Sequence, residues 1–234
     1  MAQPYGLGHI LFLVFIFIVT GLLLYFVIKK FDEKQRVLTI KIIAGVLLLF
    51  AFLSRLAMVL TLSEDKIQPI YFIPNSFCSL TGYTFALAVL LGKKDNIALH
   101  CVAYLGILGG LLTIFYPDFL VQEPTIFGFK NITALIYHSL MVILFLIIIC
   151  TGYMKVTIRK CYSLVLGFCC YMTYALFLAQ VCDMPYAMYI SKPILSDTPL
   201  YWYVLAPLAG LIYCGSLGIM YLVRYLIKRN KKEL

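Results

Sequence analysis

The 234-residue sequence is short of charged residues, and of acidic ones most of all. Only 12% of its residues are charged and ten are Asp or Glu, whereas 63% are hydrophobic. A soluble domain is typically about 45–50% apolar and about 25% charged. A soluble fold could not bury this much apolar surface, so the composition excludes an ordinary soluble domain and indicates a protein whose solvent is mainly lipid.

Sequence signatures of other protein classes are also missing. No two cysteines form a C-x-x-C pair and no Cys/His cluster has the spacing of a zinc site, so we expect no metal and no cofactor. Most of the eight cysteines fall within apolar runs, where cysteine acts as a small hydrophobe, and a disulfide framework is not expected. The net charge of +9 is not gathered in a soluble basic patch interleaved with aromatics, which argues against nucleic-acid binding.

What the sequence does have is long apolar runs. A membrane-spanning helix needs about 20 apolar residues, and seven such runs with short connections occupy the chain. The first run has nothing basic before it and no small-residue cleavage site after it, so it does not read as a signal peptide. The sequence predicts an all-α fold: a polytopic transmembrane helical bundle, residues 1–234 forming a single integral membrane domain. The expected spans are 7–28, 40–62, 73–92, 97–116, 132–153, 161–182 and 200–227.

The positions of the basic residues predict an orientation. Fifteen of the nineteen Lys and Arg residues fall in or directly beside the first, third and fifth connections and the C-terminal tail, whereas the other connections hold only Lys66, Lys130 and Lys192. Basic connections usually face the cytoplasm. We therefore expect the N-terminus outside, the C-terminus in the cytoplasm, and a multi-pass protein of the cell membrane.

Three residues that could carry chemistry fall within the expected spans. Arg55, Cys78 and His138 each lie within the outer turns of a span, about 7–11 Å below the outer surface at 1.5 Å per residue. Polar residues at membrane depth are costly and often functional. A histidine can take the proton of a thiol and a cation can stabilise the negative charge that develops, which suits acyl transfer through a thioester. Packing, snorkelling or a hydrogen bond to a neighbouring helix would also explain each residue singly.

Other polar residues are expected on the same outer side. Asn75 and Ser76 precede the third span, where they can cap the helix or contact a lipid headgroup. Asp118 ends the fourth span, and Lys192 supplies a cation from the outer connection before the last span. We interpret Arg55, Asn75, Ser76, Asp118 and Lys192 as candidate substrate-binding residues beside Cys78 and His138 as candidate catalytic residues.

Small residues at helical spacing predict close helix packing. Gly106 and Gly110 share one face of the fourth span, and Gly210 and Gly218 share one face of the last. Such faces allow two helix backbones to approach closely in lipid. They are candidate contacts with a second copy or with a helix of a partner subunit, besides membrane lipids, which are the expected partners throughout.

Several short motifs resemble those of a known family. They are Ile73-Pro74-x-x-x-Cys78, Tyr116-Pro117-Asp118, Ile136-Tyr137-His138-Ser139 and Lys192-Pro193, followed by an aromatic-rich last helix. Together they resemble the YwaF-like bacterial integral membrane proteins, which are similar to a eukaryotic multi-span membrane protein implicated in phospholipid acyl transfer. The resemblance implies that Cys78 accepts the acyl group and that His138 is its base. This sequence has Ser76 where the family has a histidine, which departs from any mechanism that needs two histidines.

Three functions remain open on this reading. The first is a membrane-embedded lipid-modifying enzyme, an acyltransferase with a cysteine nucleophile acting at the outer leaflet. The second is a non-enzymatic protein that binds or transports a lipid or a small anionic ligand in the same outward pocket. The third is a membrane partner subunit that docks another helix.

Overall fold

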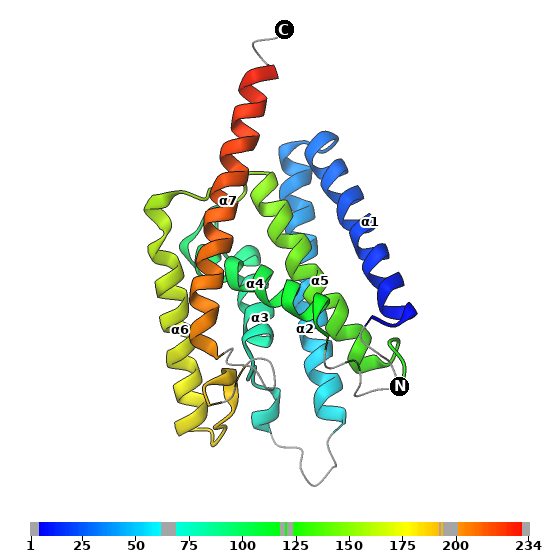
Figure 1. The fold of residues 1–234 in the computed structure, drawn as a ribbon, viewed down its shortest axis with the longest axis vertical. Helices are drawn as coiled ribbons and strands as arrows, with labels where there is room; N and C mark the ends of the chain where they lie inside the picture. The colour runs from blue at the N-terminus through cyan, green and yellow to red at the C-terminus, as the bar shows by residue number, and fades with distance from the viewer. Residues whose placement is uncertain are drawn as a thin grey trace.

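The computed structural model of the chain describes residues 5–61, 69–117, 120, 124–191, 193 and 201–230. Within these residues the fold is all-helical, with seven α-helices, three short 3₁₀ helices and no strands (Figure 1). The α-helices are α1 (Leu7–Lys29), α2 (Glu33–Leu60), α3 (Phe77–Leu90), α4 (Ile97–Phe115), α5 (Phe129–Cys150), α6 (Tyr162–Gln180) and α7 (Trp202–Asn230). The 3₁₀ helices are η2 (Pro69–Phe72), η4 (Ile158–Lys160) and η5 (Ala187–Tyr189).

Five of the described helical segments are long and apolar enough to cross a membrane. They are α1, α2, α4, α5 and the segment Ile158–Gln180 that contains α6. The apolar parts of the other two α-helices, α3 and Ala206–Leu222 of α7, are shorter. At 1.5 Å per residue the 14 residues of α3 extend about 21 Å, less than the roughly 30 Å hydrocarbon core. The all-helical membrane bundle is confirmed, whereas the number of seven spans and the orientation stay predictions.

Two helices begin four or more residues away from where the sequence predicted. The second begins at Glu33 instead of residue 40, because Asp32 and Gln35 form a capping box that starts the helix before the apolar run. The third begins at Phe77 instead of residue 73, because Ser76 has an extended backbone and its side chain caps α3 by accepting from the Ser79 N–H. Apolar content marks the part of a helix that suits the membrane, whereas capping residues mark where the helix begins.

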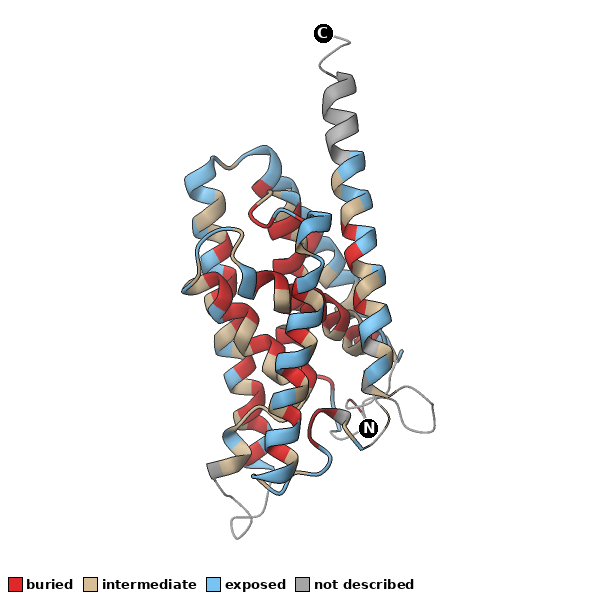
Figure 2. Ribbon diagram, turned by 90° about the vertical axis from the view of Figure 1, so that its left-hand side faces the viewer, coloured by how far each residue is buried: buried red, intermediate tan, exposed pale blue. Residues whose placement is uncertain are grey.

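The core of the bundle lies around α4 and α5. Of the most apolar 18-residue stretch of α5, 72% is buried, against 6% for α1, so α5 is central and α1 is peripheral. Helix α4 packs against α3, α5 and α6, and α2 packs against α3 and α5. Buried residues gather on the inward faces of these helices, while the outer helices are exposed over most of their surface (Figure 2).

Hydrogen bonds tie the connections together at one end of the bundle. This end, called here the basic end, holds residues 30–32, 91–96 and 151–161 and lies at the top of Figure 1. Asp95 accepts hydrogen bonds from the Lys155 N–H at 2.7 Å and from Lys160 Nζ at 2.5 Å, and it lies 2.8 Å from His100 Nε2. Burial alone would raise the pKa of the Asp95 carboxyl, but these hydrogen bonds and the Lys160 charge outweigh it and hold the pKa below its ordinary value.

Candidate functional site

The candidate site lies at the opposite end of the bundle, where the chain enters α3. Residues 73–76 are extended or irregular, and two distant elements fix them. The Tyr174 hydroxyl on α6 donates to the Pro74 carbonyl at 2.9 Å, and the Met188 N–H of η5 donates to the Asn75 carbonyl at 2.9 Å. This segment therefore has a defined position between α6 and η5, and Cys78 follows it in the first turn of α3.

The Cys78 side chain packs against α4. A methyl group at Gly109 would lie 3.0 Å from Cys78 Sγ, so the thiol occupies the space that the missing side chain leaves. Its nearest polar neighbour on that helix is Thr113 Oγ1, at 3.8 Å from the sulfur. A hydroxyl at this position can donate a weak hydrogen bond to a thiolate. The residue is half-buried.

His138 lies on α5 and packs against Gly110, the residue of α4 that follows Gly109. A methyl group at Gly110 would lie 2.8 Å from the His138 carbonyl oxygen, which shows how closely the α4 and α5 backbones approach. The His138 ring is buried, and its Nδ1 lies 2.7 Å from the Ala134 carbonyl oxygen. Because a carbonyl can only accept, Nδ1 carries the proton in this contact. In the neutral ring Nε2 is then the basic nitrogen.

Arg55 is buried on α2 and reaches the same segment. Its side chain is 5% exposed, and Nη1 donates to the Asn75 side-chain oxygen at 2.9 Å. Among the described residues Arg55 forms no ion pair, and its Nε has no hydrogen-bond partner there. The hydroxyl groups of Tyr83, Tyr174 and Tyr137 are close enough to interact electrostatically with the guanidinium. The Arg55 side chain therefore lies inside the bundle instead of facing lipid.

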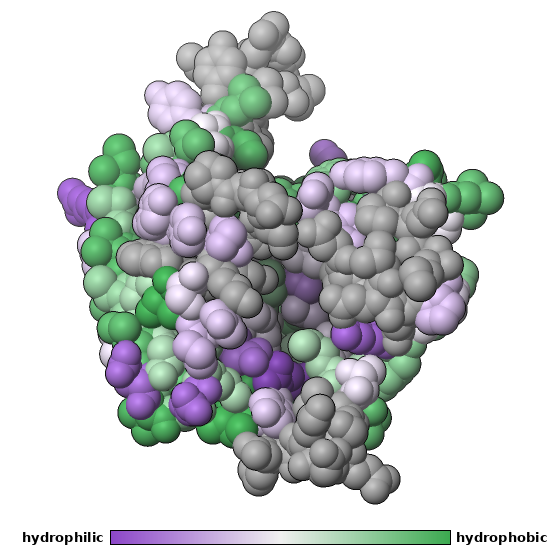
Figure 3. Space-filling model, turned by 60° about the horizontal axis from the view of Figure 1, so that its bottom comes forward, coloured by the Kyte–Doolittle hydropathy of each residue, from purple (hydrophilic) through white to green (hydrophobic). Residues whose placement is uncertain are grey.

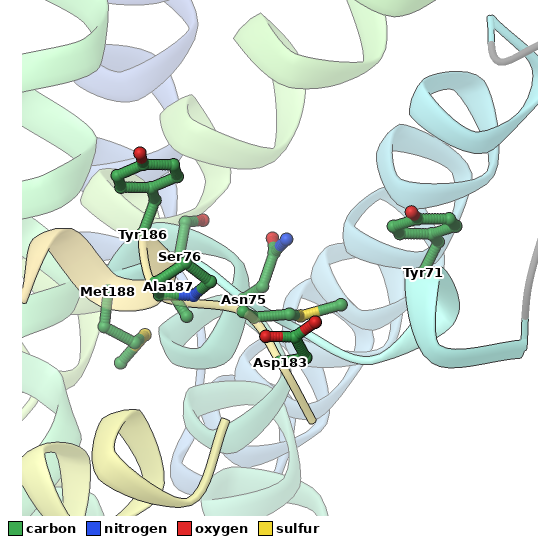
Figure 4. A pocket seen from close by; sticks show the side chains of 9 residues that line it. Tyr71, Asn75, Ser76, Asp183, Tyr186, Ala187 and Met188 are labelled. Carbon is green, nitrogen blue, oxygen red and sulfur yellow. The ribbon is translucent and has the colours of Figure 1, made fainter. Parts of the chain in front are cut away.

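A pocket of about 390 Å³ opens beside this segment. Its walls come from Tyr71, from Asn75 and Ser76, and from residues 183–188 (Figure 4). The same end of the molecule, seen in Figure 3, carries hydrophilic side chains toward its middle, and apolar ones cover much of its margin. The pocket therefore offers amide, hydroxyl and carboxylate groups at the end where the sequence places an outward site.

The structure brings some of the expected site residues together and leaves others apart. Arg55 contacts Asn75, and Asn75 and Ser76 line the pocket. Cys78 does not line it. Cys78 and His138 flank α4 at two consecutive glycines, so they lie at one level of that helix on different sides. The expected contacts of Asp118 and Lys192 lie outside the described residues.

The small-residue faces have two different environments. A methyl group at Gly106 would lie 2.9 Å from the Phe85 ring, and Gly110 faces α5, so this pair of glycines packs within the chain. Gly210 and Gly218 of α7 have open space where a side chain would be. A contact with a second copy or a partner helix stays a prediction. Of the two small-residue faces, the one on α7 is open to such a contact.

Sequence reasoning missed three contributors to the site. They are Thr113 beside the thiol, Tyr137 next to His138, and Tyr174, which holds the Pro74 carbonyl. Thr113 had a detectable signal, since it is a hydroxyl in an apolar helix one turn after the Gly109-Gly110 pair. Tyr174 had none, because one tyrosine among eighteen in an aromatic-rich membrane chain does not stand out.

Comparisons with known proteins place this chain in a family. No curated protein and no solved structure matches it. The profile of the TMEM164 family matches residues 4–221, nearly the whole chain and all the candidate site residues. The likeness to YwaF-like proteins stays a prediction. The chain belongs to the TMEM164 family of membrane proteins.

Proposed function

We propose that this membrane protein transfers an acyl group between lipids, with Cys78 as nucleophile and His138 as general base. The single observation that supports the proposal most is the pair of glycines on α4. Gly109 receives the Cys78 thiol and Gly110 receives the His138 backbone, so the thiol and the residue that carries the imidazole contact the same turn of α4. The position of the Nδ1 proton leaves Nε2 as the nitrogen that can take a proton.

The proposed reaction has two balanced steps. In the first, His138 takes the Cys78 proton, and the thiolate attacks the acyl carbonyl of a donor lipid ester. The ester C–O bond breaks, the acyl group forms a thioester with Cys78, and the leaving alcohol takes the proton from His138. In the second, His138 takes the proton of an acceptor hydroxyl, the new ester forms, and the S–C bond breaks. The thiolate then regains its proton from His138.

Arg55 and Asn75 are the proposed contact for the anionic part of the lipid. A buried guanidinium is costly unless it is paired, and here its described partner is a neutral amide. A phosphate could accept from the Nε and the remaining guanidinium hydrogens in the fork geometry that arginine favours. Because Ser76 caps α3, the position that holds a histidine in the resembling family is used here to fix the start of the helix.

The test is an acyl-transfer assay with purified protein in vesicles. The vesicles contain a phospholipid with an isotope-labelled acyl chain and a lysophospholipid acceptor, and mass spectrometry follows the label. Cys78→Ala and Cys78→Ser are expected to abolish transfer without changing the fold, since the thiol is a small packing element. His138→Ala is expected to slow transfer about 10²–10⁴-fold, the usual contribution of a general base.

A matched control separates loss of the nucleophile from loss of any thiol. Cys169→Ala removes an exposed cysteine of α6 and should leave transfer unchanged. Full transfer by the Cys78→Ala protein would refute the mechanism. A hydroxylamine-sensitive acyl adduct on Cys78 of the wild-type protein would identify the thioester directly.

The pocket supports a second candidate function, the binding of a small polar or anionic ligand without chemistry. Cys78 is absent from the residues that line the described pocket, whereas Asn75, Ser76 and Asp183 are present. A binding protein needs only these groups. Under this reading the Cys78 variants bind ligand as the wild type does, and no variant shows transfer.

A further inference from the structure

A second cavity, a groove of about 750 Å³, opens on the side of the bundle between α3, α4 and α6. It shares no lining residue with the pocket at the candidate site. Leu87, one of its lining residues, follows Cys78 by nine residues, which is two and a half helical turns and places it on the opposite face of α3. The volume is within the range of about 300–1,000 Å³ that ligand pockets show.

Close packing at two places forms the groove. A methyl group at Gly167 would lie 2.4 Å from the Cys101 carbonyl oxygen, so α6 touches the α4 backbone and forms the floor. Toward the middle of the bundle the Tyr171 hydroxyl lies 2.8 Å from Thr81 Oγ1, and its ring stacks on Phe77. Tyr171 thus bridges α6 to α3 and forms part of the groove wall.

The polar side chains that line the groove have partners within the protein. Thr84 donates to the Leu80 carbonyl, and Tyr171 contacts Thr81 and Thr84. Asn96 donates to the Ala88 and Lys93 carbonyls, and Tyr174 donates to the Pro74 carbonyl. Since these hydroxyl and amide groups are already hydrogen-bonded, the groove presents hydrocarbon to its occupant. An apolar chain fits it better than a polar ligand.

The length of the groove matches one acyl chain. Its lining along α3 and the C-cap of that helix runs from Leu80 to Leu91, which is eleven residue-to-residue steps or about 16 Å of helix. The hydrocarbon core of a bilayer is about 30 Å thick, so one leaflet contributes about 15 Å. The groove therefore extends from the basic end to the middle of the membrane, as the acyl chain of a lipid in that leaflet does.

The mouth of the groove carries positive charge. Gly92 and Asn96 line it, and the exposed Lys93 lies between them in sequence. On the α6 side the exposed Arg159 precedes Lys160, which binds Asp95 at the same end. Lysines and arginines beside a membrane attract anionic headgroups. Of the acidic residues nearby, Asp95 is bound to Lys160 and Glu33 pairs with Lys94, so neither cancels the charge of Lys93 or Arg159.

We propose that this groove binds an anionic phospholipid of the leaflet at the basic end. One acyl chain lies between α3, α4 and α6, and the phosphate contacts Lys93 and Arg159. This site is additional to the acyl-transfer site and faces the other leaflet, so it is a lipid-binding site and not a place of reaction.

Two adjacent cysteines provide a matched test. Cys170 lines the groove, whereas Cys169 is also exposed at almost the same depth but does not line it. Two variants each keep one of these cysteines and have the other seven replaced by alanine. In detergent, an apolar maleimide labels each protein with and without added phosphatidylglycerol. At a lipid concentration about ten times its dissociation constant, occupancy should slow labelling of Cys170 about tenfold and leave Cys169 unchanged.

The remaining outcomes each overturn part of the proposal. Equal slowing at both cysteines would mean a general lipid coat, and no slowing at Cys170 would mean that the groove is not occupied. Equal protection by phosphatidylcholine would refute the charged mouth, and protection by glycerol phosphate alone would refute the acyl chain. Since both variants lack Cys78, the result is independent of acyl transfer.

A second measurement uses the chain with its cysteines intact, in case the multiple replacements prevent folding. Leu87→Trp fills the groove, and Leu176→Trp places the same side chain on an exposed part of α6 outside the lining residues. Native mass spectrometry should show retained phosphatidylglycerol in the wild type and the Leu176→Trp protein and a loss in the Leu87→Trp protein. Lys93→Gln with Arg159→Gln should reduce retention, whereas Lys34→Gln, at an exposed lysine of α2, should not. Retention unchanged by Leu87→Trp would refute the site.

Discussion

The closest approach between α4 and α5 gives a sharp prediction for Gly110→Ala. The added methyl group would lie 2.8 Å from the His138 carbonyl oxygen and 2.7 Å from Val142 Cγ2. The Val142 methyl can rotate away, but the carbonyl belongs to the backbone of a buried helix. The two helices must therefore separate by several tenths of an ångström, which moves the His138 backbone with them.

The magnitude follows from two opposing terms. Replacing a helical glycine by alanine typically stabilises a helix by about 1 kcal/mol. Overpacking a close interface typically costs about 1–3 kcal/mol. Gly45→Ala has only the first term, because nothing lies within 4 Å of the added methyl group. We expect Gly110→Ala to be less stable than Gly45→Ala by about 1–3 kcal/mol.

The assay is reversible unfolding of both purified variants in mixed micelles with increasing SDS, followed by circular dichroism. Wild-type protein provides the reference, and Gly45→Ala should match or exceed its free energy of unfolding. If Gly110→Ala were as stable as Gly45→Ala, the close contact between α4 and α5 at this level would be refuted. The same result would also refute the placement of Cys78 and His138 at one level of α4.

Three further predictions concern the charged groups and the topology. Asn75→Asp should raise the thermal stability of the protein, because it gives the buried Arg55 a carboxylate partner. The same substitution should weaken the binding of anionic lipid, measured by native mass spectrometry. Unchanged lipid binding would exclude Arg55 as the anion contact. The folded-state pKa of Asp95 is lowered, so its contribution to stability is complete above the ordinary value of 3.8 and is lost as the pH falls through the lower folded value. Asp95→Asn should therefore lower stability at neutral pH and flatten the acid side of a stability profile, and an unchanged profile would contradict the contacts of Asp95. Reporter fusions at the C-terminus should be active only in the cytoplasm, and activity outside would refute the orientation that the basic residues predict.

The sequence predicts the positions of the helices along the chain better than the rotation of each helix about its own axis. Each of the seven apolar runs contains a helix, because length and hydropathy alone mark an apolar helix. The ends of α2 and α3 differ from the prediction because capping by Asp32 and Ser76 decides them. Rotation about the helix axis was not predictable. Lipid is as apolar as a core of leucine, so α5 and α1 have similar hydropathy although one is central and the other peripheral.

The candidate site was predictable in depth but not in contacts. Polar residues in apolar runs identify Arg55, Cys78 and His138, since each is costly in lipid. Arg55 contacts Asn75 because of the irregular segment that precedes α3. The spacing of apolar residues along the sequence does not reveal the conformation of that segment. Cys78 and His138 lie on different sides of α4 because they pack against Gly109 and Gly110. The small size of a glycine allows a close helix contact, but it does not identify the residue that makes the contact.

The two ends of the bundle hold buried polar groups of different kinds, and this difference locates the function. At the basic end the half-buried Asp95 binds both Lys160 and the buried His100. These contacts join connections that are far apart in sequence, and they are complete within the protein. At the opposite end the buried Arg55 binds a neutral amide, and no described carboxylate pairs with it. A network that balances its own charges stabilises a fold, whereas a buried cation without a counter-charge is retained when an anionic ligand supplies one. The acyl-transfer site is therefore proposed at the end where Arg55 binds Asn75 and where Cys78 follows three residues later in the first turn of α3. The basic end is assigned to holding the bundle together and to contact with the membrane.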